Sequence, residues 1–175
     1  MKERENAITM KGNPLTLLGE ELKLDDRAPD CELVSKDLET VNLSSFRGKI
    51  CIISSIPSLD TSVCDIMTRK FNEEAVALGD DVVVLAISMD LPFAQDRWCI
   101  AADVENVYML SDYRFRAFGE AYGVLIKDLL LLGRAVFVLD KQGTIRYIEI
   151  VTELTNEPDY EAILKAVKKL VKTDD

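Results

Sequence analysis

The chain has 175 residues, 48% of them apolar and 30% charged, which is typical of a globular protein with one buried core and unlike a disordered chain. Its net charge of −10, with no basic stripe, makes a nucleic-acid partner an unexpected one. No apolar run is long enough to span a bilayer, so we expect no membrane partner and one cytoplasmic domain over residues 1–175, frayed at 1–5 and 173–175.

The chain contains no histidine, and its four cysteines stand at positions 31, 51, 64 and 99. In a reducing compartment such cysteines serve catalysis or redox chemistry more often than structural bridging. The absence of histidine excludes Cys-His and Ser-His nucleophile pairs, most zinc sites and histidine-ligated haem. We therefore expect thiol chemistry with no cofactor and no metal ion.

The predicted elements begin with a small hairpin, in which residues 7–10 and 15–18 flank a turn at 11–14. The elements that follow are strands at 32–34 and 50–55, a helix at 63–78 ended by Gly79, a strand at 82–88, a helix at 93–103, a strand at 107–110, a helix at 115–122, a hairpin of strands 134–139 and 144–150, and an amphipathic helix at 159–171. This order predicts an α/β protein with a mixed central sheet, helices on both faces and an N-terminal β-hairpin, as in thioredoxin-like domains.

Residues 57–64 connect an apolar strand to an apolar-periodic helix and place Cys64 in the first turn of that helix. Unpaired backbone N–H groups and the helix dipole favour a thiolate there, and the thiolate is the nucleophilic form. Thr61 can cap the helix or direct its hydroxyl towards the sulfur and a bound oxygen. From the residues alone Cys64 can also be a small buried apolar residue, since free cysteine is among the most buried residue types.

Pro57, Thr61 and Cys64 stand in the spacing Pro-x-x-x-Thr-x-x-Cys, and in this the segment resembles the peroxiredoxins. Residues 11–19, 57–64, 90–95 and 121–124 are similar to segments of the bacterial thiol peroxidase branch, an atypical two-cysteine branch of that family. The resemblance extends over nearly the whole chain.

The resemblance implies a role for each of five residues. Cys64 would be the peroxidatic cysteine, Thr61 the hydroxyl that orients the peroxide, Pro57 the shield of the thiolate pocket, Arg134 the catalytic arginine and Cys99 the resolving cysteine. A fixed guanidinium would stabilise the thiolate and the charge that develops on the peroxide oxygens. Judged from the residues alone, Arg134 is an ordinary charge at the end of a strand and Cys99 packs in the core.

The resemblance also implies a reaction and its partners. Hydrogen peroxide or an alkyl hydroperoxide would oxidise Cys64 to a sulfenic acid, Cys99 would convert it to a disulfide within one chain, and thioredoxin would reduce the disulfide. A homodimer is implied as well. Because a disulfide requires Cα atoms about 4.4–6.8 Å apart and the two thiols lie on separate predicted helices, we expect local unwinding around both cysteines on oxidation.

Two other functions compete with this one. A thiol-disulfide oxidoreductase on the same fold would carry a Cys-x-x-Cys motif, and the sequence has none. A redox sensor would consume peroxide slowly and in less than stoichiometric amounts. Cys31 and Cys51 are interpreted as packing residues. The leucine-rich stretch 128–133 can be buried core or part of an apolar rim near Arg134, and its composition favours the core.

Overall fold

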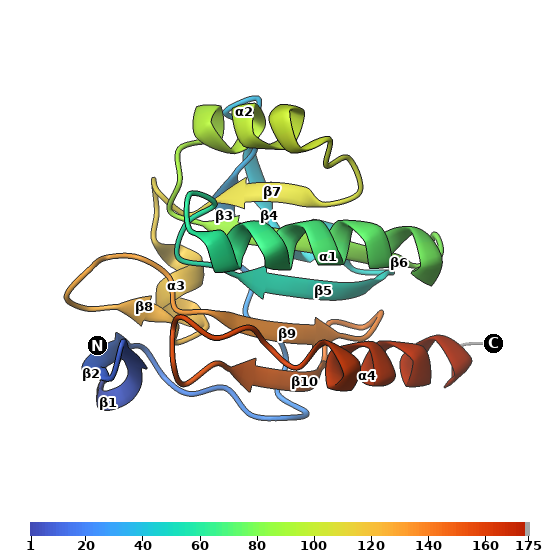
Figure 1. Cartoon of the computed structure of the whole chain (residues 1–175). Helices are drawn as coiled ribbons and strands as arrows, with labels where there is room; N and C mark the ends of the chain where they lie inside the picture. The colour runs from blue at the N-terminus through green and yellow to red at the C-terminus, as the bar shows by residue number, and fades with distance from the viewer. Residues whose placement is uncertain (174–175) are drawn as a thin grey trace.

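The structure, a computed structural model, describes residues 1–173, which form two β-sheets with helices packed around them (Figure 1). The strands are β1 Glu3–Met10, β2 Asn13–Leu18, β3 Glu32–Val34, β4 Thr40–Asn42, β5 Ile50–Ser55, β6 Val82–Ser88, β7 Tyr108–Ser111, β8 Leu125–Ile126, β9 Ala135–Leu139 and β10 Ile145–Ile150. The helices are the 3₁₀-helix η1 Leu43–Phe46 and the α-helices α1 Ser62–Leu78, α2 Pro92–Ala102, α3 Ala117–Ala121 and α4 Tyr160–Thr173.

The larger sheet has seven strands in the order β10-β9-β5-β6-β7-β3-β4. Its centre is parallel, because β5 pairs with β6 and β6 with β7 in the same direction, whereas β9 runs antiparallel to β5. All residues of β5 and β6 are buried, as expected for strands covered on both faces. A parallel pair needs a crossover connection, and α1 supplies it between β5 and β6. The predicted mixed sheet of an α/β protein is confirmed.

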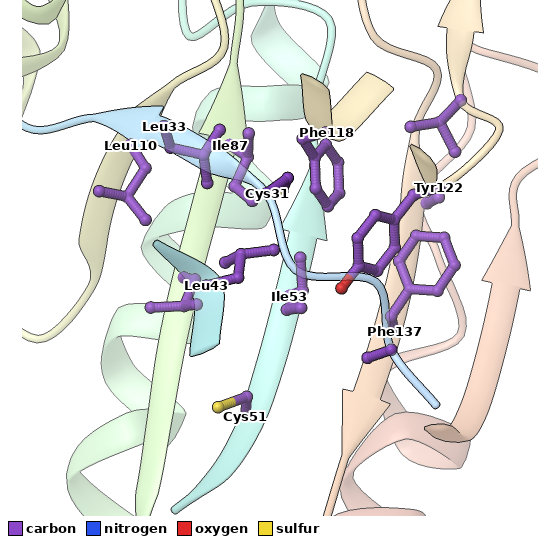
Figure 2. Close-up of a cluster of buried hydrophobic side chains, with 14 of the residues drawn as sticks. Cys31, Leu33, Leu43, Cys51, Ile53, Ile87, Leu110, Phe118, Tyr122 and Phe137 are labelled. Carbon is purple, nitrogen blue, oxygen red and sulfur yellow. The ribbon is translucent and has the colours of Figure 1, made fainter. Parts of the chain in front are cut away.

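Apolar side chains cover both faces of this sheet. On one face α1 and α4 pack along the strands (Figure 1), with Phe71 of α1 and Val167 of α4 in the same cluster. The opposite face carries a second cluster that includes α3 and its aromatic residue Phe118 (Figure 2). Cys31 and Cys51 belong to this second cluster, where burial raises the pKa of both thiols. Both are packing residues, as predicted.

The smaller sheet, in the order β1-β2-β8, contains the predicted N-terminal hairpin. Its first strand begins at Glu3, where the sequence predicts a frayed end, because Arg4 donates to the carbonyls of Gly19 and Gly123 and Lys127 pairs with Glu3 at 2.8 Å. The helix predicted at 115–122 is confined to α3, and the short elements β4, η1 and β8 are not predicted. At the other end α4 continues to Thr173, and the predicted fraying of 174–175 lies outside the described residues.

The leucine-rich stretch 128–133 is not the buried core that its composition predicts. Leu129 and Leu130 are 41% and 49% exposed, and only Leu132 is fully buried among the leucines. The amide of Leu130 donates to the carbonyl of Ile126, and the φ angle of Leu130 is +53°, so the chain turns here between β8 and β9. A turn at the surface exposes the two leucines whatever their hydrophobicity. Within residues 1–173 no helix is both long and apolar enough to cross a bilayer.

Gly123 supports a close contact between the hairpin and the end of α3. Its φ angle is +67°, and a Cβ there would meet the carbonyl oxygen of Glu20. We expect Gly123→Ala to lower the free energy of unfolding by about 3 kcal/mol, from the left-handed backbone and the overpacking together. Gly12→Ala is the control, because Gly12 has a φ of +81° but open space around it, and should cost only about 1 kcal/mol. Urea unfolding of both variants measures the difference, and equal losses would contradict the close-contact argument.

Candidate active site

Cys64 lies in the first turn of α1, beyond the carboxyl end of β5. Thr61 has extended backbone angles and caps the helix, with its carbonyl accepting from the amide of Asp65 at 3.0 Å and its hydroxyl from the amide of Cys64 at 3.4 Å. The same hydroxyl donates to the carbonyl of Ser58 at 3.0 Å. Thr61 therefore acts as the helix cap, one of the two roles open to it, and its hydroxyl lies at the helix end that carries the cysteine.

Arg134 contacts Cys64 from the segment that precedes β9. It precedes β9, whose first residue pairs with the last residue of β5, so the antiparallel register brings it to the same edge of the sheet. Its Nη1 donates to Cys64 Sγ at 3.1 Å and lies 3.7 Å from Met67 Sδ. Its Nε and Nη2 donate to the carbonyl oxygen of Leu154 at 3.0 and 2.8 Å. These two bonds hold the guanidinium in one orientation, with Nη1 directed at Cys64 Sγ.

The guanidinium of Arg134 is only 2% exposed, and no carboxylate within residues 1–173 forms an ion pair with it. A buried charge is costly unless an opposite charge or strong hydrogen bonds compensate it. The carbonyl of Leu154 supplies part of this compensation. Cys64 Sγ, at 3.1 Å, faces this charge, so the site is suited to chemistry in which negative charge develops beside the guanidinium.

The carbonyl that fixes Arg134 belongs to a segment bound to the N-terminal hairpin. The amide of Leu154 donates to the carbonyl of Thr9 at 2.8 Å, and the amide of Thr9 donates to the carbonyl of Thr152 at 2.7 Å. This bridge joins β1 to the chain that follows β10, two segments more than 140 residues apart in the sequence. The hairpin thus contributes to the orientation of the guanidinium.

Glu153 strengthens this bridge and is a residue that the sequence analysis missed. Its carboxylate accepts from the amide of Gly12 at 2.9 Å, from the hydroxyl of Thr9 at 3.0 Å, and from the amide and hydroxyl of Thr155 at 2.9 and 2.6 Å. These bonds, those of Thr155 first, lower the pKa of Glu153 to about 2. A polar stretch after a strand was the available signal, but nothing local indicates which residue binds a distant hairpin.

A second polar network holds the segment before Cys64. Asp90, just after β6, accepts from the hydroxyls of Ser58 and Ser88 at 2.7 and 2.8 Å and from the amide of Leu59 at 2.9 Å. Pro57 is buried at the start of this segment. The network ties the cap of α1 to the chain that enters α2, and Asp90 was noticed in the sequence only as part of a family-like segment.

Cys99 lies on α2, and the structure does not bring it to Cys64: all four cysteines are free thiols. It is half-buried and lines a groove of about 750 Å³ between α2 and the segment that contains β7. Burial first, and then the carboxylate of Asp96, raise the pKa of Cys99 to about 11, while Lys36 opposes the shift. Cys99 is therefore a thiol at neutral pH in this conformation.

The arrangement of Cys64, the start of α1 and Arg134 suits Cys64 to act as a nucleophile. Cys64 has a helix terminus on one side and a fixed cation on the other, which are the two features that stabilise a thiolate and a developing anion. Its side chain has no exposed surface, so a substrate enters only when the surrounding segment moves. No group of three or more potential metal ligands occurs within residues 1–173.

Comparisons with known proteins agree with this geometry. The family model described as Redoxin matches residues 23–164. A protein of Bacillus subtilis named thiol peroxidase is 55% identical over 165 residues, which cover 94% of this chain and 98% of that protein.

Solved structures of similar shape lead to the same family. A peroxiredoxin-like protein from Aquifex aeolicus has a TM-score of 0.88 and 43% sequence identity, with 94% of this chain and 97% of that chain covered. A thiol peroxidase from Chromobacterium violaceum has a TM-score of 0.84 at 21% identity, with 95% and 97% covered, and shows the same fold.

The hydrogen bonds of Glu153 should affect the reactivity of Cys64, although Glu153 does not touch its sulfur. Glu153→Ala removes the acceptor for Gly12 and Thr155, so the carbonyl of Leu154 should become less fixed and the guanidinium less well aimed. We expect alkylation of Cys64 by iodoacetamide at pH 7 to slow roughly three- to tenfold, in line with the weakening of one hydrogen bond worth about 1 kcal/mol. Glu161→Ala, which removes an exposed carboxylate of α4, is the control and should leave the rate unchanged. An unchanged rate in Glu153→Ala would mean that Arg134 is oriented without the bridge.

Proposed function

The chain belongs to the Redoxin family and is a thiol-dependent peroxidase, and on this premise we propose that Cys64 attacks the peroxide and Cys99 resolves the oxidised sulfur. The observation that carries the proposal is the 3.1 Å contact from the buried guanidinium of Arg134 to Cys64 Sγ. A buried cation with no carboxylate partner among the described residues is suited to a sulfur that attacks as an anion.

The first step transfers one oxygen from the peroxide to sulfur. The thiolate of Cys64 attacks the terminal oxygen of the hydroperoxide, an S–O bond forms as the O–O bond breaks, and the leaving alkoxide or hydroxide takes a proton to become alcohol or water. Arg134 offsets the charge that develops on the oxygens, and the Thr61 hydroxyl at the mouth of the site orients the peroxide. Buried Pro57 shields the pocket from water.

The second step converts the sulfenic acid on Cys64 into a disulfide. The sulfur of Cys99 attacks, the S–S bond forms, and the hydroxyl leaves with the proton of Cys99 as water. Cys64 is fully buried and Cys99 lies on another helix, so we propose that the first turn of α1 and the segment around Cys99 unwind locally for this step.

The disulfide then requires a dithiol reductant, and a thioredoxin-type protein is general for this family. We propose thioredoxin itself, in the cytoplasm, where reduced thiols are maintained. We also propose that the protein is a homodimer, on the family resemblance. Hydrogen peroxide and alkyl hydroperoxides are both proposed as substrates.

The assignment of the two sulfurs is tested by peroxide consumption with a thioredoxin system. Cys64→Ser should abolish turnover, because among residues 1–173 Cys64 is the thiol that accepts a hydrogen bond from Arg134. Cys99→Ser should retain a single oxidation of Cys64, with a sulfenic acid that can be trapped, and lose dithiol-dependent turnover. Cys51→Ser is the control, since Cys51 is a core packing residue. Turnover that survives in Cys64→Ser would refute the role of Cys64, and full turnover in Cys99→Ser would refute resolution by Cys99.

The raised pKa of Cys99 predicts a pH dependence for its reactivity. Because the thiolate is the reactive form, alkylation of Cys99 in a Cys64→Ser background should accelerate as the pH rises towards about 11. Asp96→Asn removes a carboxylate that disfavours the thiolate, so the profile should move to lower pH, and Lys36→Met should move it to higher pH. Asp103→Asn, on the same groove, serves as the control and should not shift the profile. An unshifted profile in Asp96→Asn would contradict the electrostatic part of this argument.

A further inference from the structure

The helices that carry the two cysteines meet through a polar and aromatic cluster that the mechanism above does not use. The indole Nε1 of Trp98 on α2 donates to Asp65 Oδ1 on α1 at 2.9 Å. Arg69 on α1 donates to the second oxygen of Asp65 at 2.9 Å, and its guanidinium lies over the Trp98 ring at 5.5 Å. Arg69 also donates to the carbonyl of Ala102 at 3.3 Å, at the end of α2. We call Asp65, Arg69 and Trp98 the latch.

Two of the latch residues, Asp65 and Trp98, are the direct sequence neighbours of Cys64 and Cys99. Adjacent residues on an α-helix point about 100° apart, so a residue that faces the other helix turns its neighbour away. Asp65 faces α2, and Cys64 points instead at Arg134. Trp98 faces α1, and Cys99 lines the groove on the β7 side.

With the latch closed, the two thiols therefore point to different places, Cys64 to Arg134 and Cys99 to the groove. Each helix must turn by about one residue position, or unwind, to bring Cys64 and Cys99 together. Either movement carries Asp65 and Trp98 out of the positions in which their hydrogen bond forms. The closed latch and the disulfide would then be alternative arrangements of the same two helices.

Outside the latch α2 has few strong attachments to the rest of the protein. Of its residues only Pro92 and Gln95 are buried, and Phe93 and Ile100 are 64% and 73% exposed. Gln95 donates to the hydroxyl of Ser88 and the carbonyl of Leu110, which fixes the beginning of the helix. The second half, which carries Cys99, is held mainly by the latch and by contact with the α1 face of the core.

We propose that the latch positions α2 during peroxide attack and must open before the resolving step, and that it thereby sets the lifetime of the sulfenic acid on Cys64. This inference rests on the proposed roles of Cys64 and Cys99. Trp98 acts through the helix that carries Cys99 and is a positioning residue. A longer lifetime gives a second hydroperoxide time to transfer a further oxygen to the same sulfur, with formation of a sulfinic acid and release of another alcohol or water.

The test is a single-turnover measurement on Trp98→Phe, which keeps an aromatic ring but deletes the N–H donor. One equivalent of hydrogen peroxide is added to the reduced protein, aliquots are quenched by alkylation, and mass spectrometry counts thiol, sulfenic acid and disulfide. We expect the disulfide to form roughly three- to tenfold faster than in the wild type, with first-step oxidation of Cys64 unchanged. Under excess peroxide the sulfinic fraction should fall by a similar factor. Arg69→Met, which removes the other tie between the helices, should change both quantities in the same direction.

Tyr147→Phe is the matched control, because it deletes an aromatic O–H donor to a carboxylate, Glu149, on β10 and leaves α1 and α2 untouched. It should resolve at the wild-type rate, and urea unfolding of all variants separates the kinetic effect from a loss of stability. A Trp98→Phe protein that resolves at or below the wild-type rate would overturn the latch while the roles of the cysteines remain. A wild type that oxidises Cys64 but forms no disulfide with Cys99 would overturn the proposed resolving role, and the latch with it.

Discussion

The buried positive charge of Arg134 is the constraint on which the rest of the site depends. With no carboxylate partner among the described residues, the guanidinium is stabilised by one carbonyl oxygen and by whatever charge the neighbouring sulfur carries. The carbonyl of Leu154 stays in place because the N-terminal hairpin pairs with its segment. An element remote from the cysteine in sequence thus helps to hold a cation against the sulfur.

The topology of the larger sheet explains how these groups converge. The carboxyl ends of parallel strands β5 and β6 lie at one edge, and the antiparallel β9 begins at that same edge. Cys64 follows β5, Asp90 follows β6 and Arg134 precedes β9. Three segments that are separate in the sequence therefore meet at one end of the sheet. Open α/β sheets bind ligands beyond the carboxyl ends of their strands, and this site follows that rule.

What could be predicted from the sequence was mostly local. The strand Ile50–Ser55, the helix cap at Thr61 and the helix stop at Gly79 depend on near neighbours, and all three are found in the structure. The contact between Arg134 and Cys64 follows from register across the sheet, which no local pattern displays, and only family resemblance indicated it. Glu153 was missed because its partners belong to a distant hairpin, and Leu130 was misjudged because its hydrophobicity says nothing of a turn.

The two cysteines are subject to opposite physical demands. Cys64 must be enclosed, because the field of a buried guanidinium and a helix terminus is strong only where water is excluded. Cys99 must be movable, because its sulfur has to reach a site that the fold keeps closed, and a helix with two buried residues can be displaced at small cost. Burial also raises the pKa of Cys99, so its sulfur is a neutral thiol in the conformation in which the peroxide reacts. The fold keeps apart two sulfurs that the reaction must finally join, so the contacts between α1 and α2 decide when one state gives way to the other.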